Sequence, residues 1–160
     1  EQISAQEIDE VSISSTKIRT ALNEGKIDLA NEYLGYNYSF TGLVVHGKKL
    51  GRTIGFPTAN LKIEESYKLI PAKGVYAVKC KVGNQKLKGM LNIGTNPTFH
   101  GEHLSIEVNL FNFDGEIYGE KITVELIKRI RDESKFNSVD ELKTQLHKDA
   151  FFAQQLFENE

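Results

Sequence analysis

A change of hydrophobic period along the chain is the feature that most constrains the fold. From Phe40 onward, apolar residues recur at every second position instead of every third or fourth. Strands are expected over residues 43–45, 76–82, 86–93, 106–110 and 122–126, and the alternation is regular in 76–82, 106–110 and 122–126. A period of two is typical of strands with one buried face, and Gly-bearing turns rather than helical patterns separate these runs. The pattern therefore predicts a mainly β protein whose antiparallel sheet curls into a small barrel.

Helical patterns are confined to the two ends of the chain. Ser14-Ser15-Thr16 offers an N-cap for a first short helix, and Asp28 is expected to cap a second one that ends at Gly35. Ser138, with Glu141 three residues later, forms a capping box for a C-terminal helix. Its apolar stripe is expected to lie against the barrel and consists of Val139, Leu142, Leu146, Ala150, Ala153 and Phe157.

Composition limits the class of protein. A length of 160 residues fits one domain, or one domain with a fragment of another. The formal net charge of −2 argues against a non-specific polyanion binder, so no nucleic-acid partner is expected. Because Cys80 is the single cysteine, no intrachain disulfide can form, and its place in an alternating run favours a core residue over a nucleophile. With no apolar run of membrane-spanning length, a cytoplasmic protein without a membrane partner is expected.

A glycine-rich stretch begins at the first expected strand and continues to Gly55. Residues 42–49 nearly match the phosphate-loop pattern G-x-x-x-x-G-K-[ST], but Lys49 replaces the hydroxyl residue and strand-like residues fill the loop. We therefore reject that motif. Glycine allows close approach of the backbone to an anion. The glycines and basic residues between positions 42 and 55 can thus form either a phosphate-contacting loop or a solvated turn. These residues are Gly42, Gly47, Lys48, Lys49, Gly51, Arg52 and Gly55.

Three polar residues are candidates for chemistry. Pro57 favours extended backbone before it, and continued extension would place Thr58 and Asn60 on one side of the chain. A hydroxyl and an amide oxygen suit Mg²⁺ held mainly by phosphates and water, although both can equally cap a polar turn. Glu107 alternates with the apolar residues of its run and could act as a general base, or be a solvated charge.

These segments together resemble riboflavin kinase, and more closely the kinase half of the bacterial bifunctional riboflavin kinase/FAD synthetase. The resemblance runs from about Tyr38 to the C-terminus. The segments that carry it are Gly42-x-Val-Val-x-Gly47, Gly51-Arg52-x-x-Gly55-Phe-Pro-Thr-Ala-Asn60, Asn92-Ile-Gly-x-Asn-Pro-Thr-Phe99, Glu107-Val-x-Leu-Phe and Asp114-Gly-x-x-Tyr118-Gly119. The resemblance implies a six-stranded antiparallel Greek-key barrel with a C-terminal helix. It also implies ATP- and Mg²⁺-dependent phosphorylation of the riboflavin ribityl 5′-hydroxyl to give FMN.

The same resemblance implies roles for individual residues. Glu107 would be the catalytic base, while Thr58 and Asn60 would hold Mg²⁺. ATP would be bound by Gly47, Lys48, Gly51, Arg52, Gly55, Leu110, Asn112 and Tyr118. The flavin would be bound by Arg131, Ser134 and Phe136, and Ser134 stands where a lysine is common in relatives.

The N-terminal stretch resembles a different part of the bifunctional enzyme. Ile13-Ser-Ser-Thr-Lys-Ile-Arg19 is similar to the final signature of its nucleotidyltransferase half. Residues 1–36 are thus expected to be the end of that domain with linker helices, and residues 37–160 the kinase domain. Since no His-x-Gly-His motif occurs in the sequence, the chain is expected to be a piece of a longer protein that makes FMN but not FAD. The alternatives are a non-catalytic flavin- or nucleotide-binding barrel and an oligonucleotide-binding barrel.

Overall fold

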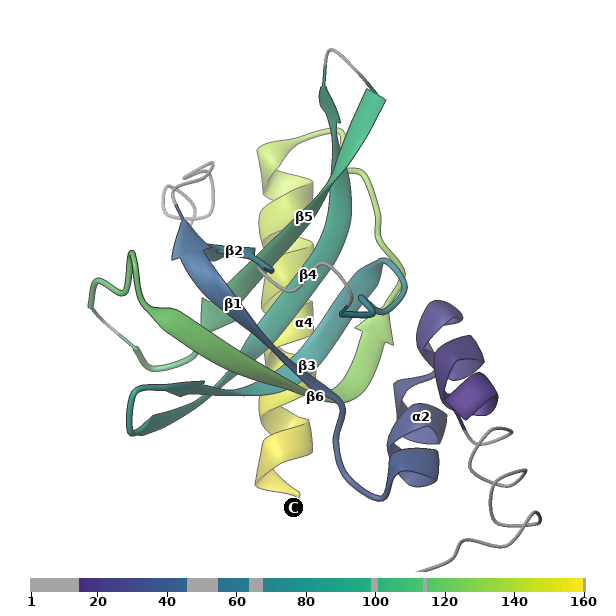
Figure 1. The fold of residues 1–160 in the computed structure, drawn as a ribbon. Helices are drawn as coiled ribbons and strands as arrows, with labels where there is room; N and C mark the ends of the chain where they lie inside the picture. The colour runs from purple at the N-terminus through teal and green to yellow at the C-terminus, as the bar shows by residue number, and fades with distance from the viewer. Residues whose placement is uncertain (1–14, 46–54, 64–67, 99–100, 114, 160) are drawn as a thin grey trace, which may run out of the picture.

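A closed barrel of antiparallel strands forms the centre of the protein, as Figure 1 shows for the computed structural model. The structure describes residues 15–45, 55–63, 68–98, 101–113 and 115–159. The strands are β1 (Ser39–Val45), β2 (Ala59–Lys62), β3 (Gly74–Val82), β4 (Gln85–Thr98), β5 (Gly101–Leu110) and β6 (Lys121–Arg131). Helices cover residues 15–23, α2 (Ile27–Leu34) and α4 (Val139–Glu158).

The strand order around the barrel is β1-β2-β5-β4-β3-β6, and every neighbouring pair is antiparallel. Strands β3, β4 and β5 follow one another, and β6 then returns to pair with β3, which is a Greek-key arrangement. The predicted fold class is therefore confirmed. The residue pattern alone did not indicate β2, because this strand has only four residues.

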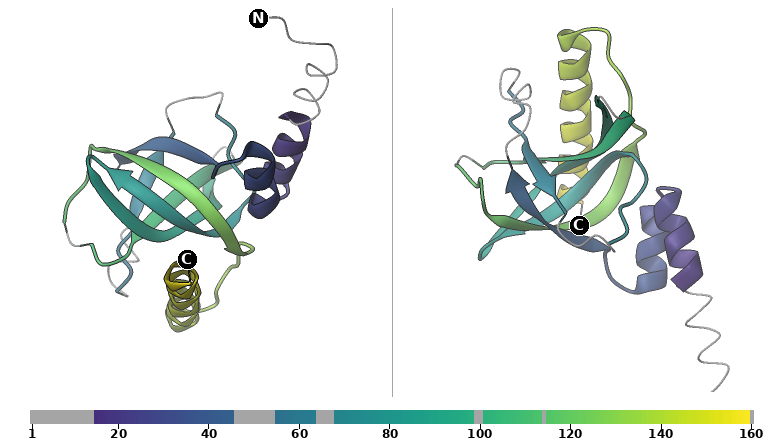
Figure 2. Two further views of the ribbon diagram at one scale, coloured as in Figure 1. Left: turned by 90° about the horizontal axis from the view of Figure 1, so that it is seen from below. Right: turned by 45° about the horizontal axis from the view of Figure 1, so that its top comes forward.

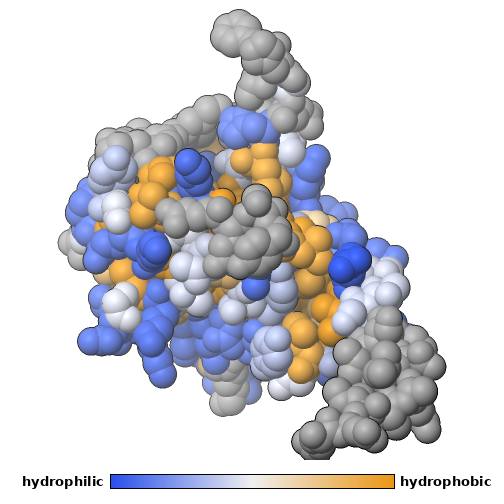
Figure 3. All heavy atoms as spheres, viewed as in Figure 1, coloured by the Kyte–Doolittle hydropathy of each residue, from blue (hydrophilic) through white to orange (hydrophobic). Residues whose placement is uncertain are grey.

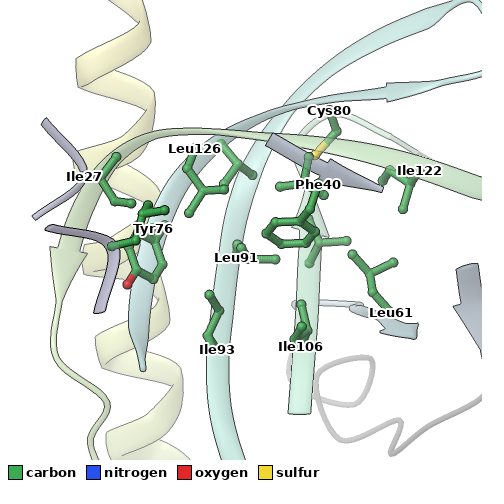
Figure 4. Packing of buried hydrophobic residues seen from close by; sticks show 14 of the residues in the cluster. Ile27, Phe40, Leu61, Tyr76, Cys80, Leu91, Ile93, Ile106, Ile122 and Leu126 are labelled. Carbon is green, nitrogen blue, oxygen red and sulfur yellow. The ribbon is translucent and has the colours of Figure 1, made fainter. Parts of the chain in front are cut away.

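The alternating apolar residues fill the interior of the barrel. Tyr76, Leu91, Ile93, Ile122 and Leu126 are fully buried there, and Figure 4 shows them with Phe40 in the packed interior. Cys80 belongs to the same cluster, so the predicted core role of this cysteine is confirmed. Burial raises the pKa of the Cys80 thiol to about 12, which keeps it protonated and unreactive at neutral pH.

The N-terminal helices pack on the barrel and contribute to its main core. Leu22 and Ile27 are 1% exposed and belong to the same cluster as Tyr76. Figure 4 shows Ile27 and Tyr76 of this cluster. Gly35 ends α2 in the left-handed conformation, as expected. The expected capping role of Asp28 is wrong. Lys26 is the N-cap residue of α2, and Asp28 lies within the first turn of the helix. There Asp28 forms an ion pair of 3.6 Å with Lys128 of β6.

Helix α4 lies along a different side of the barrel from the N-terminal helices (Figure 2). It begins as predicted, because the Ser138 Oγ accepts a hydrogen bond of 3.1 Å from the Glu141 backbone N–H. Ala153 and Phe157 are buried against Ala77. Val139 departs from the expected stripe, since it is 50% exposed at the first turn, before the helix reaches the barrel.

Hydrophilic side chains cover much of the face shown in Figure 3, with apolar patches between them. Among the described residues, no helix is both long and apolar enough to span a membrane.

Candidate functional site

Strand pairing lines up a row of residues on the outer face of the barrel. Asn60 of β2 is opposite Glu107 of β5, and Glu107 is also opposite Asn92 of β4. Asn92 in turn is opposite Val75 of β3, and Val75 is opposite Arg131 of β6. Opposed residues in antiparallel strands place their side chains on the same face, about 5 Å apart. The register therefore brings the candidate base, one candidate metal ligand and one candidate flavin residue to one strip of surface.

A pocket with a volume of about 220 Å³ lies over this row, between the barrel and α4. Its lining residues are Phe56, Thr58, Val75, Met90, Leu91, Asn92, Glu107, Asn109, Arg131, Glu133, Ser134, Phe136, Leu142 and Leu146. Seven of these fourteen residues are apolar and seven are polar or charged, a mixture that suits a ligand with both an apolar part and hydrogen-bonding groups.

Five of the residues predicted from sequence share this lining. They are Thr58, Glu107, Arg131, Ser134 and Phe136. Asn60 is outside the lining but lies directly across the strand pair from Glu107. The carboxylate and the two predicted metal ligands therefore come from one neighbourhood, although they are far apart in the sequence.

Asn109 fixes the backbone just before Thr58. Its side chain is 8% exposed, and its Nδ2 donates a hydrogen bond of 2.6 Å to the Pro57 carbonyl oxygen. On the other side of this segment, the Phe56 ring meets the His147 ring of α4 edge to face, with centroids 4.7 Å apart. The segment that carries Thr58 is thus held by both β5 and α4. Our sequence reasoning did not single out Asn109, although its place on the same strand face as Glu107 was a usable signal.

Glu133 adds a second carboxylate to the pocket. Its Oε1 accepts a hydrogen bond of 3.4 Å from the Thr95 backbone N–H. A side chain at Gly94 would overlap the Glu133 carboxylate, so the glycine leaves room for it over β4. Glu133 was also missed from the sequence, because nothing in the pattern shows that residues 132–136 turn back over the sheet.

The described residues among those predicted to bind ATP are outside this lining. Asn112 has a positive φ of 54° in the turn after β5, and Tyr118 is 51% exposed. The loop that carries Tyr118 lies beside the end of β1, because the Gly119 N–H donates to the Val44 carbonyl oxygen at 3.0 Å. Gly55 has a φ of 87° and Leu110 packs against the main core. The predicted nucleotide-loop residues Gly47, Lys48, Gly51 and Arg52 lie outside the described residues.

The donor atoms near Glu107 fit Mg²⁺ chemically. The Thr58 hydroxyl and the Asn60 amide are hard oxygen donors, as is the carboxylate opposite Asn60. Within the described ranges, no three His, Cys, Asp or Glu residues come together as a metal cluster. A few hard oxygen donors suit a cation such as Mg²⁺, which takes one or two protein ligands and completes its coordination shell with phosphate oxygens and water.

A closed barrel with an external pocket, a carboxylate and a hard-oxygen pair has the parts that phosphoryl transfer requires, which are positioning and charge neutralisation rather than covalent chemistry. The family model for riboflavin kinase, described as Flavokinase, matches residues 34–157. This chain therefore belongs to the riboflavin kinase family.

Similar proteins agree with that membership. The chain is 51% identical over 150 residues to the bifunctional riboflavin kinase/FMN adenylyltransferase of Bacillus subtilis, covering 92% of this chain and 47% of the relative. It is 45% identical over 148 residues to the protein of the same description in Escherichia coli K12, covering 92% and 47%. The chain thus spans about half the length of these curated relatives.

Two solved structures share the fold. A Streptococcus pneumoniae protein described as a macrolide-efflux protein aligns with a TM-score of 0.81 at 47% identity, over 86% of this chain and 45% of that one. The riboflavin kinase of Trypanosoma brucei aligns with a TM-score of 0.51 at 21% identity, over 75% of this chain and 76% of that one. The latter likeness concerns the fold alone.

Proposed function

We propose that this chain transfers the γ-phosphoryl group of ATP to the ribityl 5′-hydroxyl of riboflavin, which gives FMN and ADP. The observation that carries the proposal is the position of Glu107, which lines the pocket and is opposite Asn60 in the strand pairing. A carboxylate among the lining residues of the pocket can face the hydroxyl of a ligand whose ring system contacts the apolar lining residues.

In this proposal Glu107 accepts the proton of the 5′-hydroxyl as the bond between that oxygen and the γ-phosphorus forms. The bond from the γ-phosphorus to the bridging oxygen breaks, and ADP leaves with its electron pair. Thr58 and Asn60 would hold Mg²⁺, which when bound supplies charge neutralisation on the phosphates. Asn109 keeps the backbone beside Thr58 in place through its hydrogen bond to the Pro57 carbonyl.

The substrates are proposed to occupy two different sides of Glu107. Ser134 and Phe136 line the pocket together with Leu142 and Leu146 of α4, and this side would take the flavin ring. ATP would lie toward the end of β1, contacted by Gly47, Lys48, Gly51, Arg52, Gly55, Leu110, Asn112 and Tyr118. Arg131 was expected to bind the flavin, and its guanidinium is paired with Asp149.

The expected partners are riboflavin and FMN, ATP and ADP, and an FMN adenylyltransferase domain, because the curated relatives are described as bifunctional. We propose no adenylyltransferase activity for residues 1–160. A cytoplasmic location is proposed because Cys80 is a buried free thiol, which suits a reducing compartment. If the chain converted FMN and ATP to FAD, as seen by chromatography, the proposal that it lacks adenylyltransferase activity would be wrong.

The Glu107→Gln variant tests the reaction. Because a positioned general base contributes about 10²–10⁴-fold, FMN formation from riboflavin and Mg·ATP should fall at least about 100-fold, with binding of both substrates retained. Glu32→Gln removes the same charge from an exposed position of α2 and should leave turnover unchanged. A passive flavin-binding barrel would form no FMN with either protein, and undiminished turnover in Glu107→Gln would remove Glu107 as the base.

A further inference from the structure

Asp149 is an acidic residue in the part of α4 that faces the barrel. It is 1% exposed and lies between the pocket residue Leu146 and the buried Ala153. A carboxylate at such a position is costly to bury unless its oxygens are paired. Its presence in an otherwise apolar stripe therefore needs an explanation, and the sequence-based description of the helix gave it no role.

Both oxygens of Asp149 are occupied by donors. Arg131 Nε lies 2.9 Å from Oδ1 and 3.0 Å from Oδ2, and Arg131 Nη2 lies 2.9 Å from Oδ2. Gln145, one turn earlier on α4, donates from Nε2 to Oδ1 at 2.9 Å. This fork-like pairing joins the last residue of β6 to the middle of α4.

The rest of the Arg131 guanidinium holds the chain that follows β6. Its Nη1 donates to the Asp132 carbonyl oxygen at 3.0 Å, and its centre lies 5.7 Å from the centroid of the Phe136 ring. The guanidinium thus contacts a carboxylate, a carbonyl and an aromatic face at once. Residues 133, 134 and 136 of this segment all line the pocket.

We propose that Asp149 is a positioning residue for the acceptor substrate. It fixes the Arg131 guanidinium, which fixes residues 132–136, and it sets the distance between this segment and the Leu142 and Leu146 wall of α4. Arg131 then influences flavin binding by shaping the pocket, and it donates no hydrogen bond to the flavin. This inference rests on the proposed function, since it takes riboflavin as the ligand of the pocket.

The Asp149→Asn variant of the full chain tests the inference. Asparagine keeps the size of the side chain but loses the charge that pairs with the guanidinium. Riboflavin binding is followed by quenching of flavin fluorescence, and Mg·ADP binding by calorimetry, at a temperature where circular dichroism shows the variant folded. We expect the Kd for riboflavin to rise about tenfold, as the loss of a charge-assisted hydrogen bond implies, with the Kd for Mg·ADP within about twofold of the wild type.

Asp140→Asn is the matched control, because it makes the same change at an exposed position in the first turn of α4. It should leave both Kd values unchanged. If Asp149→Asn does not fold, Gln145→Met gives the test instead, since Gln145 donates directly to Asp149. It should weaken riboflavin binding while sparing Mg·ADP. Unchanged riboflavin binding in the folded variant used, or an equal loss for both ligands, overturns the inference.

A double-mutant cycle with Arg131→Lys separates positioning from direct contact. Lysine keeps the charge but not the planar fork. If both residues act through one contact, the double variant should have about the same Kd for riboflavin as either single variant. A much larger loss for Arg131→Lys than for Asp149→Asn would make Arg131 a direct flavin ligand and overturn the inference. A wild-type chain that fails to quench riboflavin contradicts the proposed function itself.

Discussion

The substitution Leu22→Ala tests whether the N-terminal helices belong to the core of the kinase fold. Leu22 is 1% exposed and shares one buried cluster with Tyr76 and Ile27. Its carbonyl oxygen also accepts a hydrogen bond of 3.0 Å from the Ala72 N–H, in the segment leading into β3. The family match begins only at residue 34, so nothing in that match assigns these helices to the fold.

The expected loss of stability follows from the burial of Leu22 and from how little the surrounding side chains can move into the cavity that alanine would leave. Replacing a fully buried leucine by alanine costs about 2–5 kcal/mol, and more where the surroundings cannot move in. Tyr76 is held by strand pairing on both sides and by its hydroxyl bond to the Ala72 carbonyl, so it cannot fill the space. We therefore expect the free energy of unfolding to fall by about 3 kcal/mol, a large part of the roughly 5–15 kcal/mol typical of a whole domain.

Urea unfolding followed by circular dichroism measures this loss. Leu104→Ala is the matched control, because Leu104 lies on β5 and is 46% exposed, and it should cost no more than about 0.5 kcal/mol. Equal midpoints for the two variants would refute the reasoning. Such a result would mean that the helices separate from the barrel in solution and that residues 37–160 hold together without them.

Three further predictions concern the barrel and α4. In Gly89→Ala, an added Cβ would overlap the Asn109 carbonyl oxygen across the β4–β5 pair, so we expect a loss of at least about 2 kcal/mol in urea unfolding; an unchanged midpoint would contradict the close approach. Because burial raises the pKa of Cys80 from 9.0 to about 12, the thiol ionises first in the unfolded chain, and the free energy of unfolding should decrease from about pH 9 to pH 12. Cys80→Ala should remove up to about 1.4 kcal/mol per pH unit of that slope, and parallel curves would count against the assignment. Ser138→Ala removes the N-cap of α4 and should lower the free energy of unfolding by about 1 kcal/mol. Ser39→Ala is the comparison, because Ser39 lies at the start of β1 and caps no helix.

Much of the fold was accessible from the sequence because a half-buried strand must alternate. The runs at residues 76–82 and 122–126 fall within β3 and β6, and Ser138 with Glu141 marks the start of α4. The short β2 was missed, since four residues are too few to establish a period. The sequence could not show which surface Leu22 covers, because an apolar helix face does not identify the surface against which it packs.

The candidate site was predictable only where a residue type suggested chemistry. Glu107 and Thr58 stood out as a carboxylate and a hydroxyl in suggestive segments, and both line the pocket. Asn109 and Asp149 act on the positions of other groups, so neither side chain suggested a chemical step by itself, although Asn109 shares a strand face with Glu107. Asp149 did leave a trace in the sequence, because it lies three residues after Leu146 and four before Ala153, a spacing that places it on the apolar side of the helix.

The location of the pocket follows from the size of the barrel. Eight strands give an interior just wide enough for side chains to fill, and here six strands enclose a fully packed apolar core (Figure 4). A ligand must therefore bind outside, where the sheet alone offers only an open surface. Helix α4 turns that surface into a pocket by contacting Phe56 through His147 on one side and Arg131 through Asp149 on the other. His147 and Asp149 are separated by a single position on α4, and they contact the two opposite walls of the pocket. A shift of α4 relative to the barrel should therefore move the segment that carries Thr58 and the segment that carries Phe136 together.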